Sequence, residues 1–151
     1  MNAFVTAGAG FLLAVLWFDL MFDVQARGGA SGAAEVPEAA LASIAAYYAR
    51  VTTTARPMNR LIAAAMLATI AAIVVEIVEG AGPGWLPWVS LALASPPIAL
   101  AAGRTVPAAV RLGMRRDVSS VQSSLARRVL TEHVFCFISI ASLIAVQLGW
   151  G

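Results

Sequence analysis

The chain has 151 residues, of which 60% are hydrophobic and only 12% are charged, whereas roughly 25% of residues are charged in soluble domains. A soluble fold of this composition would expose large apolar patches, which excludes an ordinary soluble domain and indicates an all-α membrane protein. All ten basic residues are arginines, and they fall between Arg27 and Arg60 and between Arg104 and Arg128. We interpret them as determinants of membrane topology. The adjacent arginines lack interleaved aromatics, so no nucleic-acid partner is expected.

The first apolar run covers residues 4–22 and is long enough for a transmembrane helix, which needs roughly 20 residues. No basic residue precedes it, and Asp19 and Asp23 interrupt its end, so a cleaved signal peptide is not expected. A first cytoplasmic loop is predicted over residues 24–57. Its start, residues 27–36, is rich in glycine and alanine and predicts a flexible segment.

A short helix is predicted inside this loop. Pro37 suits the first turn of a helix, and apolar side chains then recur at helical spacing. The resulting stripe consists of Leu41, Ile44, Ala45 and Tyr48. Such a helix lies at the membrane interface or extends the next span, and we expect Arg56-Pro57 to break or kink it.

Three further apolar runs predict three more spans, over residues 58–78, 86–103 and 129–148. A tight turn rich in glycine, residues 80–84, joins the first two of these runs as an antiparallel hairpin. The middle run contains Pro96 and Pro97, and each proline removes a backbone hydrogen bond, so a kink is expected there. A second cytoplasmic loop, partly helical, is predicted over residues 104–128.

The predicted architecture is therefore one domain, residues 1–151, in which four transmembrane helices form an antiparallel bundle. Both arginine-rich loops share a side, so the bias in basic residues places them in the cytoplasm and both termini outside. Trp85, Trp88 and Trp150 fall at the opposite, arginine-free side, where an aromatic belt is expected. The short loops favour a bacterial inner membrane.

Ionisable residues from all four predicted helices fall within one or two turns of the cytoplasmic boundary. These residues are Asp19, Asp23, Arg60, Arg104, Glu132 and His133. Ionisable groups inside a span tend to face the bundle interior, so we expect them to form one polar cluster.

Three interpretations of this cluster stay open. The two aspartates pair with Arg60, Arg104 or Arg128 and pin the helix ends together. Alternatively, Asp19 and His133 form a catalytic acid–base pair. In the third interpretation, His133 and the aspartates hold a hard or borderline cation. Their spacing matches no established metal motif, so no resident metal or cofactor is predicted.

A second acidic pair, Glu76 and Glu79, lies at the outer end of the second span, with Gln147 at matching depth on the fourth. No basic residue on that side balances it. The pair either consists of hydrated carboxylates that end the span or marks an entry path for a proton or another cation. The single cysteine, Cys136, excludes an internal disulfide and is expected to pack as a small apolar residue.

A pattern of short motifs runs from Ala46-Tyr47-Tyr48 to Arg56-Pro57-Met58, continues with Pro97, Thr105-Val106-Pro107 and Leu112, and ends with residues 127–133. This pattern resembles that of the small four-helix membrane proteins grouped with the anthrone oxygenases. Some members of that group oxidise polycyclic phenols with dioxygen and without a metal or flavin. The resemblance implies that His133 is nearest to a catalytic base. The chain departs from the pattern at Ala108 and Ala109, where members often carry an asparagine.

Three functions follow from these observations. The first is a non-catalytic bundle that acts as a subunit, scaffold or small homo-oligomer, for which the alanine-rich faces of the second span allow close helix approach. The second is a membrane enzyme that takes a lipophilic small molecule from the bilayer, with His133 as base and Asp19 orienting it. The third is a small proton-coupled transporter that uses Glu76 or the pair of Asp19 and His133.

Overall fold

The computed structural model describes residues 3–27, 35–54, 56–80 and 82–151, and in this part of the chain the structure is helical, with short turns and no strand. In chain order its elements are α1 (Ala3–Asp23), η1 (Val24–Arg27), α2 (Glu38–Ala49), η2 (Arg50–Thr54), α3 (Arg56–Glu79), α4 (Leu86–Leu100), η3 (Ala101–Thr105), α5 (Val106–Met114) and α6 (Ser119–Trp150). The segment η1 is a 3₁₀ turn, and η2 and η3 are π-helical turns. Most of the loop predicted to be flexible, residues 28–34, lies outside the described residues.

Four helical stretches are long and apolar enough to cross a membrane: Ala3–Arg27, Pro57–Glu79, Leu86–Met114 and Ser119–Trp150. The prediction of an all-α protein with four such helices is therefore confirmed. Large apolar side chains point outward from them, including Phe4, Leu67 and Ile138, which are 80%, 72% and 60% exposed. Such a surface fits lipid rather than water.

The third and fourth helical stretches extend further than predicted. The segment predicted to be a partly helical loop, residues 104–128, consists mostly of α5 and the start of α6. Pro96 and Pro97 lie inside α4 without ending it. In an α-helix, Pro107 would crowd the carbonyl of Gly103, four residues earlier, but Gly103 lies within the π-helical turn η3. This wider turn lets one helical path continue from α4 into α5.

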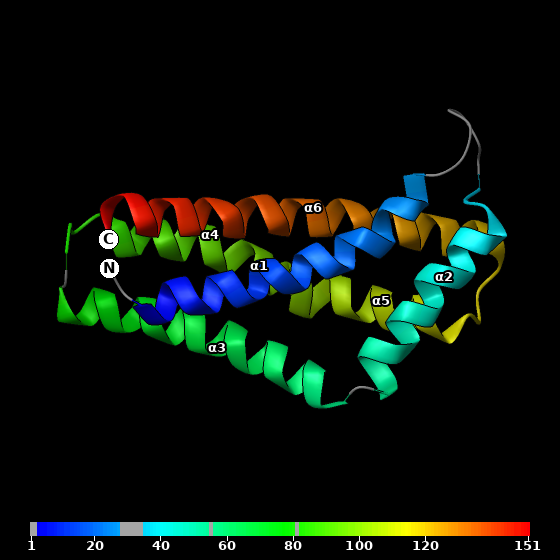
Figure 1. Ribbon diagram of the computed structural model, residues 1–151, viewed down its shortest axis with the longest axis horizontal. Helices are drawn as coiled ribbons and strands as arrows, with labels where there is room; N and C mark the ends of the chain where they lie inside the picture. Colours follow the sequence, from blue (N-terminus) through cyan, green and yellow to red (C-terminus); the bar gives the residue numbers. More distant parts are fainter. Residues whose placement is uncertain (1–2, 28–34, 55, 81) are drawn as a thin grey trace.

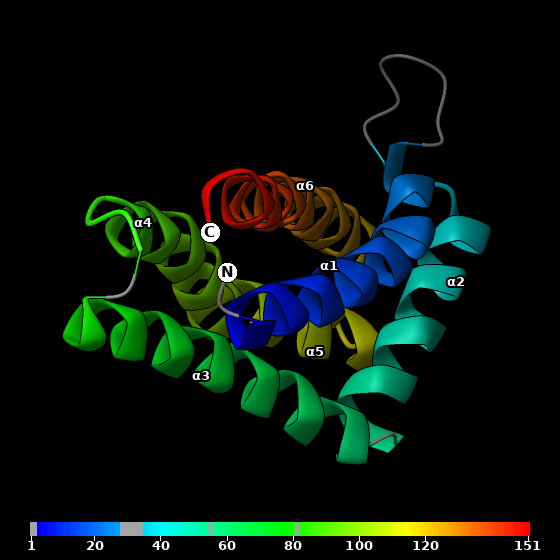
Figure 2. The same cartoon turned by 60° about the vertical axis from the view of Figure 1, so that its left-hand side comes forward.

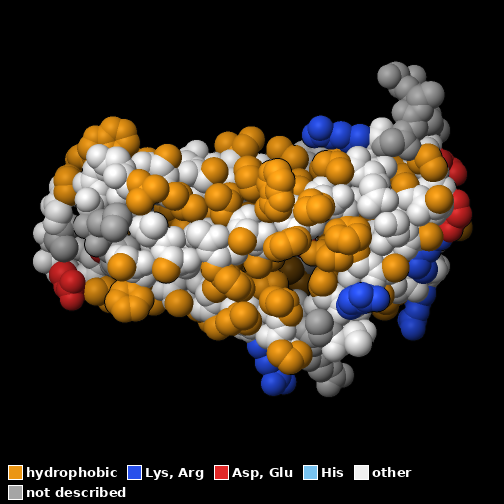
Figure 3. All heavy atoms as spheres, viewed as in Figure 1, with side chains coloured by type: hydrophobic (Ala, Val, Ile, Leu, Met, Phe, Trp, Pro, Cys, Tyr) orange, Lys and Arg blue, Asp and Glu red, His pale blue; other side chains and the backbone are white. Residues whose placement is uncertain are grey.

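A π-helical turn also precedes the proline at the start of α3. The carbonyl four residues before Pro57 belongs to Thr53, which lies in the π-helical turn η2. The chain changes direction here instead of continuing straight: α2 crosses the end of the molecule, whereas α1, α3, α4 and α6 run along its length (Figures 1 and 2). The start of α1 and the end of α6 lie at the opposite end. On the face shown in Figure 3, the arginines gather on the half of the molecule that contains α2 and α5, which we call the arginine-rich end.

Two hydrophobic cores hold these helices. One core joins α1, α3, α4 and α6 in the arginine-free half, through residues such as Val5, Ile73, Ala94 and Leu143. The other joins α2, α5 and the first half of α6 at the arginine-rich end; its members include Leu41, Ile44, Leu112 and Val129. Gly113 permits the contact between α5 and α2, because a β-carbon there would lie 2.7 Å from the backbone nitrogen of Ala49.

Candidate functional site

A cavity of about 290 Å³ lies between the two cores. In the described part of the chain the backbone of α3 lies beside α1, α4 and η2 but farther from the backbones of α5 and α6, which leaves room for the cavity between them. Its walls are mostly apolar, with side chains from four helices: Leu12, Leu16, Ile62, Met66, Ile98 and Ile140. Figure 3 shows a hollow among the hydrophobic side chains in the middle of this face.

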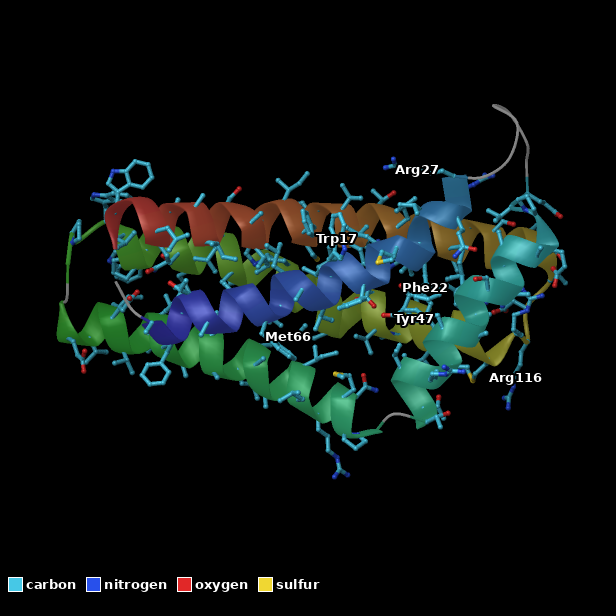
Figure 4. The ribbon with its side chains drawn as sticks, in the orientation of Figure 1. Trp17, Phe22, Arg27, Tyr47, Met66 and Arg116 are labelled. Atoms are coloured by element: carbon cyan, nitrogen blue, oxygen red, sulfur yellow. The ribbon has the colours of Figure 1, made fainter. Side chains whose placement is uncertain are left out.

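Polar side chains gather at the end of the cavity nearest α2. They are Asp19, Tyr47, Tyr48, Thr52, Asn59, Thr105 and His133. Phe22 of α1 stacks on Tyr47 of α2, with ring centroids 4.1 Å apart and planes 9° apart, and Figure 4 shows these two rings side by side. This stacking fixes one of the phenol rings against α1.

His133 of α6 is held by a carboxylate beneath the cavity. Its Nδ1 lies 2.6 Å from Oδ2 of Asp23, at the end of α1, and Asp23 is fully buried. An ionised carboxylate can only accept hydrogen bonds, so Nδ1 carries the proton in this pair. In the neutral ring, Nε2 is then left as an acceptor. The hydroxyl of Tyr48 donates to Oδ1 of Asp23 at 2.7 Å, so both carboxylate oxygens are engaged.

Asp19 lies one turn earlier on α1 and faces the same ring. Its Oδ2 is 3.9 Å from Nε2 of His133, and its Oδ1 accepts a hydrogen bond of 2.6 Å from the hydroxyl of Tyr47. The spacing of Asp19 and Asp23 by four residues places both carboxylates on one helical face. One imidazole is therefore bordered by two carboxylates, each of which a tyrosine holds in position.

Both phenols stay protonated in this environment. Burial, and then the neighbouring aspartates, raise the pKa of Tyr47 and of Tyr48 above the ordinary value of 10.0. Each ring therefore acts as a hydrogen-bond donor to its carboxylate. Sequence reasoning placed Tyr48 on an apolar stripe and did not assign either hydroxyl to the cluster. The adjacent tyrosines were the available signal, but their partners depend on how α2 packs against α1.

Glu132 is buried and belongs to a separate network between α6 and η3. Its carboxylate accepts hydrogen bonds from Nε of Arg128 and from the hydroxyl of Thr105, both at 2.8 Å, and Nε of Arg104 lies 3.5 Å away. Thr105 belongs to η3 and also lines the cavity. This network ties the π-helical turn to α6.

The predicted cluster of six residues is thus divided, and one member lies apart from it. Asp19, Asp23 and His133 lie together, and Arg104 and Glu132 form the neighbouring network. Arg60 is exposed on α3, and the described residues include no ion pair that contains it. The expected pairing of the aspartates with arginines is not found among the described residues, because tyrosines and the histidine occupy that place.

The two outer carboxylates differ from each other. Glu79 is exposed, whereas Glu76 is only 6% exposed and faces the interior. Nε2 of Gln147 lies 3.4 Å from Oε2 of Glu76 and donates to the hydroxyl oxygen of Ser90 at 2.9 Å. The sequence placed Gln147 at the depth of Glu76, and the structure brings the two side chains into contact.

Cys136 is buried, and its thiol lies 3.7 Å from the carbonyl oxygen of Pro97. The described residues contain no group of three or more His, Cys, Asp and Glu side chains placed to hold a metal ion. No family model, curated protein or solved structure matches the chain.

Proposed function

We propose that this protein is a membrane enzyme that binds a lipophilic molecule in the cavity and removes a proton from it through His133. The observation that carries the proposal is the position of the imidazole. Its Nδ1 is 2.6 Å from a fully buried carboxylate, while the ring itself lines an apolar cavity. A base oriented by a third group in this way is the arrangement that activates histidine in many enzymes.

The proton would move in one step. Nε2 of His133 accepts the proton of a substrate hydroxyl, and the products are an imidazolium and a substrate oxyanion. Asp23, on the opposite ring nitrogen, stabilises the positive charge as the buried carboxylate of a catalytic triad does. Asp19, 3.9 Å from Nε2, adds a second negative charge beside the ring. The cavity walls limit the access of water, which strengthens these interactions.

The substrate class follows from the shape and polarity of the cavity. A long apolar wall leads to a small polar end, which suits a hydrophobic molecule that carries one acidic hydroxyl. The resemblance to anthrone oxygenases supports a polycyclic phenol, for which dioxygen would be the next reactant. The apolar hollow in the hydrophobic surface supports entry from the bilayer rather than from water.

We further propose that the arginine-rich end faces the cytoplasm of a bacterial cell and that the protein lies in the inner membrane. The bias of basic residues supports this orientation. At the other end Trp85, Trp88 and Trp150 are 46%, 59% and 59% exposed, and the rings of Trp85 and Trp150 meet edge to face at 5.9 Å. Exposed tryptophans are typical of the membrane–water interface.

The test uses 1-hydroxypyrene, a lipophilic phenol whose fluorescence distinguishes the phenol from the phenolate. We expect the purified protein in detergent to bind the probe and to raise its phenolate fraction. His133→Ala should retain binding and lose the phenolate signal, while Glu79→Gln, at the other end of the molecule, should match the wild type. Equal phenolate fractions in His133→Ala and the wild type would exclude His133 as the base. Absence of any binding would favour a non-catalytic subunit instead.

A further inference from the structure

The interior of the arginine-free half contains a carboxylate without a cation. Glu76 lies about one turn before the end of α3 and is only 6% exposed. No basic residue occurs in the sequence between Arg60 and Arg104 or after Arg128. A charge buried in a membrane span is costly unless a partner neutralises it. Glu76 therefore requires a counter-charge that the described protein does not supply.

Two neighbouring helices contribute polar side chains to its surroundings. Gln147 of α6 is fully buried, and its Nε2 is 3.4 Å from Oε2 of Glu76 and 2.9 Å from the hydroxyl oxygen of Ser90 of α4. The remaining amide atom, Oε1 of Gln147, has no hydrogen-bond partner. Rotation of the amide group exchanges the positions of Nε2 and Oε1, so either atom can face Glu76. With the amide reversed, a carboxylate, an amide oxygen and a hydroxyl converge from three helices.

Like Oε1 of Gln147, another oxygen atom at this end of the molecule lacks a hydrogen-bond partner. Oγ1 of Thr6, in the first turns of α1, is buried and accepts or donates no hydrogen bond among the described residues. The start of α1 and the end of α6 lie together in Figures 1 and 2. Uncharged and carboxylate oxygens of this kind are the ligands that hard cations prefer.

We propose that Glu76, Ser90 and Gln147 form a binding site for one monovalent cation, either Na⁺ or H⁺, near the arginine-free end. One bound positive charge neutralises the single carboxylate. The reversed amide of Gln147 then directs its oxygen toward the ion or toward the protonated carboxyl group. Ionisable side chains within membrane spans mark ion and proton pathways in many transporters. The exposed carboxylate of Glu79, three residues beyond Glu76, lies on the side from which the ion arrives.

Two measurements on the full chain in detergent distinguish the ions. The first is the thermal midpoint Tm in NaCl and in choline chloride at equal ionic strength, because a ligand that binds only the folded state raises Tm with its concentration. The second is the infrared C=O stretch of protonated carboxyl groups, measured as the difference between wild type and Glu76→Gln. Glu79→Gln is the matched control, and Gln147→Leu tests the site without changing its charge.

If Na⁺ is the ion, Tm rises with Na⁺ in the wild type and in Glu79→Gln, and this rise is lost in Glu76→Gln and reduced in Gln147→Leu. If H⁺ is the ion, Tm does not depend on Na⁺, and a protonated carboxyl band disappears in Glu76→Gln but not in Glu79→Gln. Should Tm be the same in both salts and the band difference be absent, Glu76 is ionised without a bound cation and the proposal is wrong.

Discussion

Asp23→Asn is the substitution that most directly perturbs the proposed base. Asp23 is fully buried and accepts from the hydroxyl of Tyr48 at 2.7 Å and from Nδ1 of His133 at 2.6 Å. Asparagine keeps one acceptor and places two N–H donors where the second acceptor was. Two charge-assisted hydrogen bonds, from Tyr48 and from His133, are then replaced by contacts with a neutral amide, which are roughly half as strong. Such a loss costs about 1–3 kcal/mol, or roughly 5- to 150-fold in the unfolding equilibrium constant.

The same substitution should also stop proton removal. An asparagine N–H that faces Nδ1 selects the other tautomer of His133, in which Nε2 carries the proton and accepts nothing. In serine proteases the corresponding exchange lowers kcat by about 10⁴-fold through this tautomer. We therefore expect Asp23→Asn to lose the 1-hydroxypyrene phenolate signal as well as stability.

The assay compares the wild type, Asp23→Asn and Tyr48→Phe in detergent. It measures unfolding by denaturant, monitored by tryptophan fluorescence, and the phenolate fraction of the bound probe. Tyr48→Phe is the control, because it removes one donor to Asp23 but leaves Asp23 bound to His133; it should cost about 0.5–1.5 kcal/mol and keep the phenolate signal. The reasoning is refuted if Asp23→Asn matches the wild type in both measurements.

Three further outcomes are expected. Gly113→Ala should lower Tm, at a cost of about 1–3 kcal/mol for overpacking, because its β-carbon meets the backbone of Ala49; Gly103→Ala, which has open space around it, should not. The chain has only two tyrosines, so an absorbance titration of the folded protein should show no phenolate near pH 10.0, whereas the unfolded protein should show it. A transition of the folded protein near pH 10.0 would contradict the burial of the two tyrosines. Their raised pKa values also mean that stability falls as pH rises above 10.0. Hydrogen bonds from Arg111 hold the pKa of exposed Asp117 below its ordinary 3.8, so NMR should show that Arg111→Gln raises it; stability from this pair is present above pH 3.8 and lost as pH falls through the lower value.

The sequence predicts the helices because hydropathy and length decide which segments cross a membrane. It falls short between Arg104 and Arg128, where we predict a loop that is only partly helical and the structure has the end of η3, α5, a short turn and the start of α6. There the π-helical turn η3 absorbs the proline and the helix continues. A proline therefore predicts a disturbance of the helix but does not by itself say whether the helix ends.

The candidate site shows a second limit of sequence reasoning. Position along a helix predicts depth in a membrane, and on this ground the sequence grouped Asp19 and Asp23 with His133, whose ring nitrogens lie 3.9 Å and 2.6 Å from their carboxylate oxygens in the structure. Depth does not give the direction in which a side chain points, and Arg60 lies at a suitable depth but is exposed on the surface of α3. The contribution of Tyr47 also depends on a tertiary feature, the path of α2 across the end of the molecule (Figure 4).

The most direct test uses the single histidine of the chain. Protein labelled with ¹⁵N-histidine gives the spectrum of one imidazole, that of His133, in detergent micelles. In the neutral ring we predict a protonated Nδ1, bound to Asp23, and an unprotonated Nε2 whose resonance shifts when 1-hydroxypyrene is added. A neutral ring that carries its proton on Nε2, or an Nε2 resonance that the probe leaves unchanged, would contradict the assignment of His133 as a base facing the cavity.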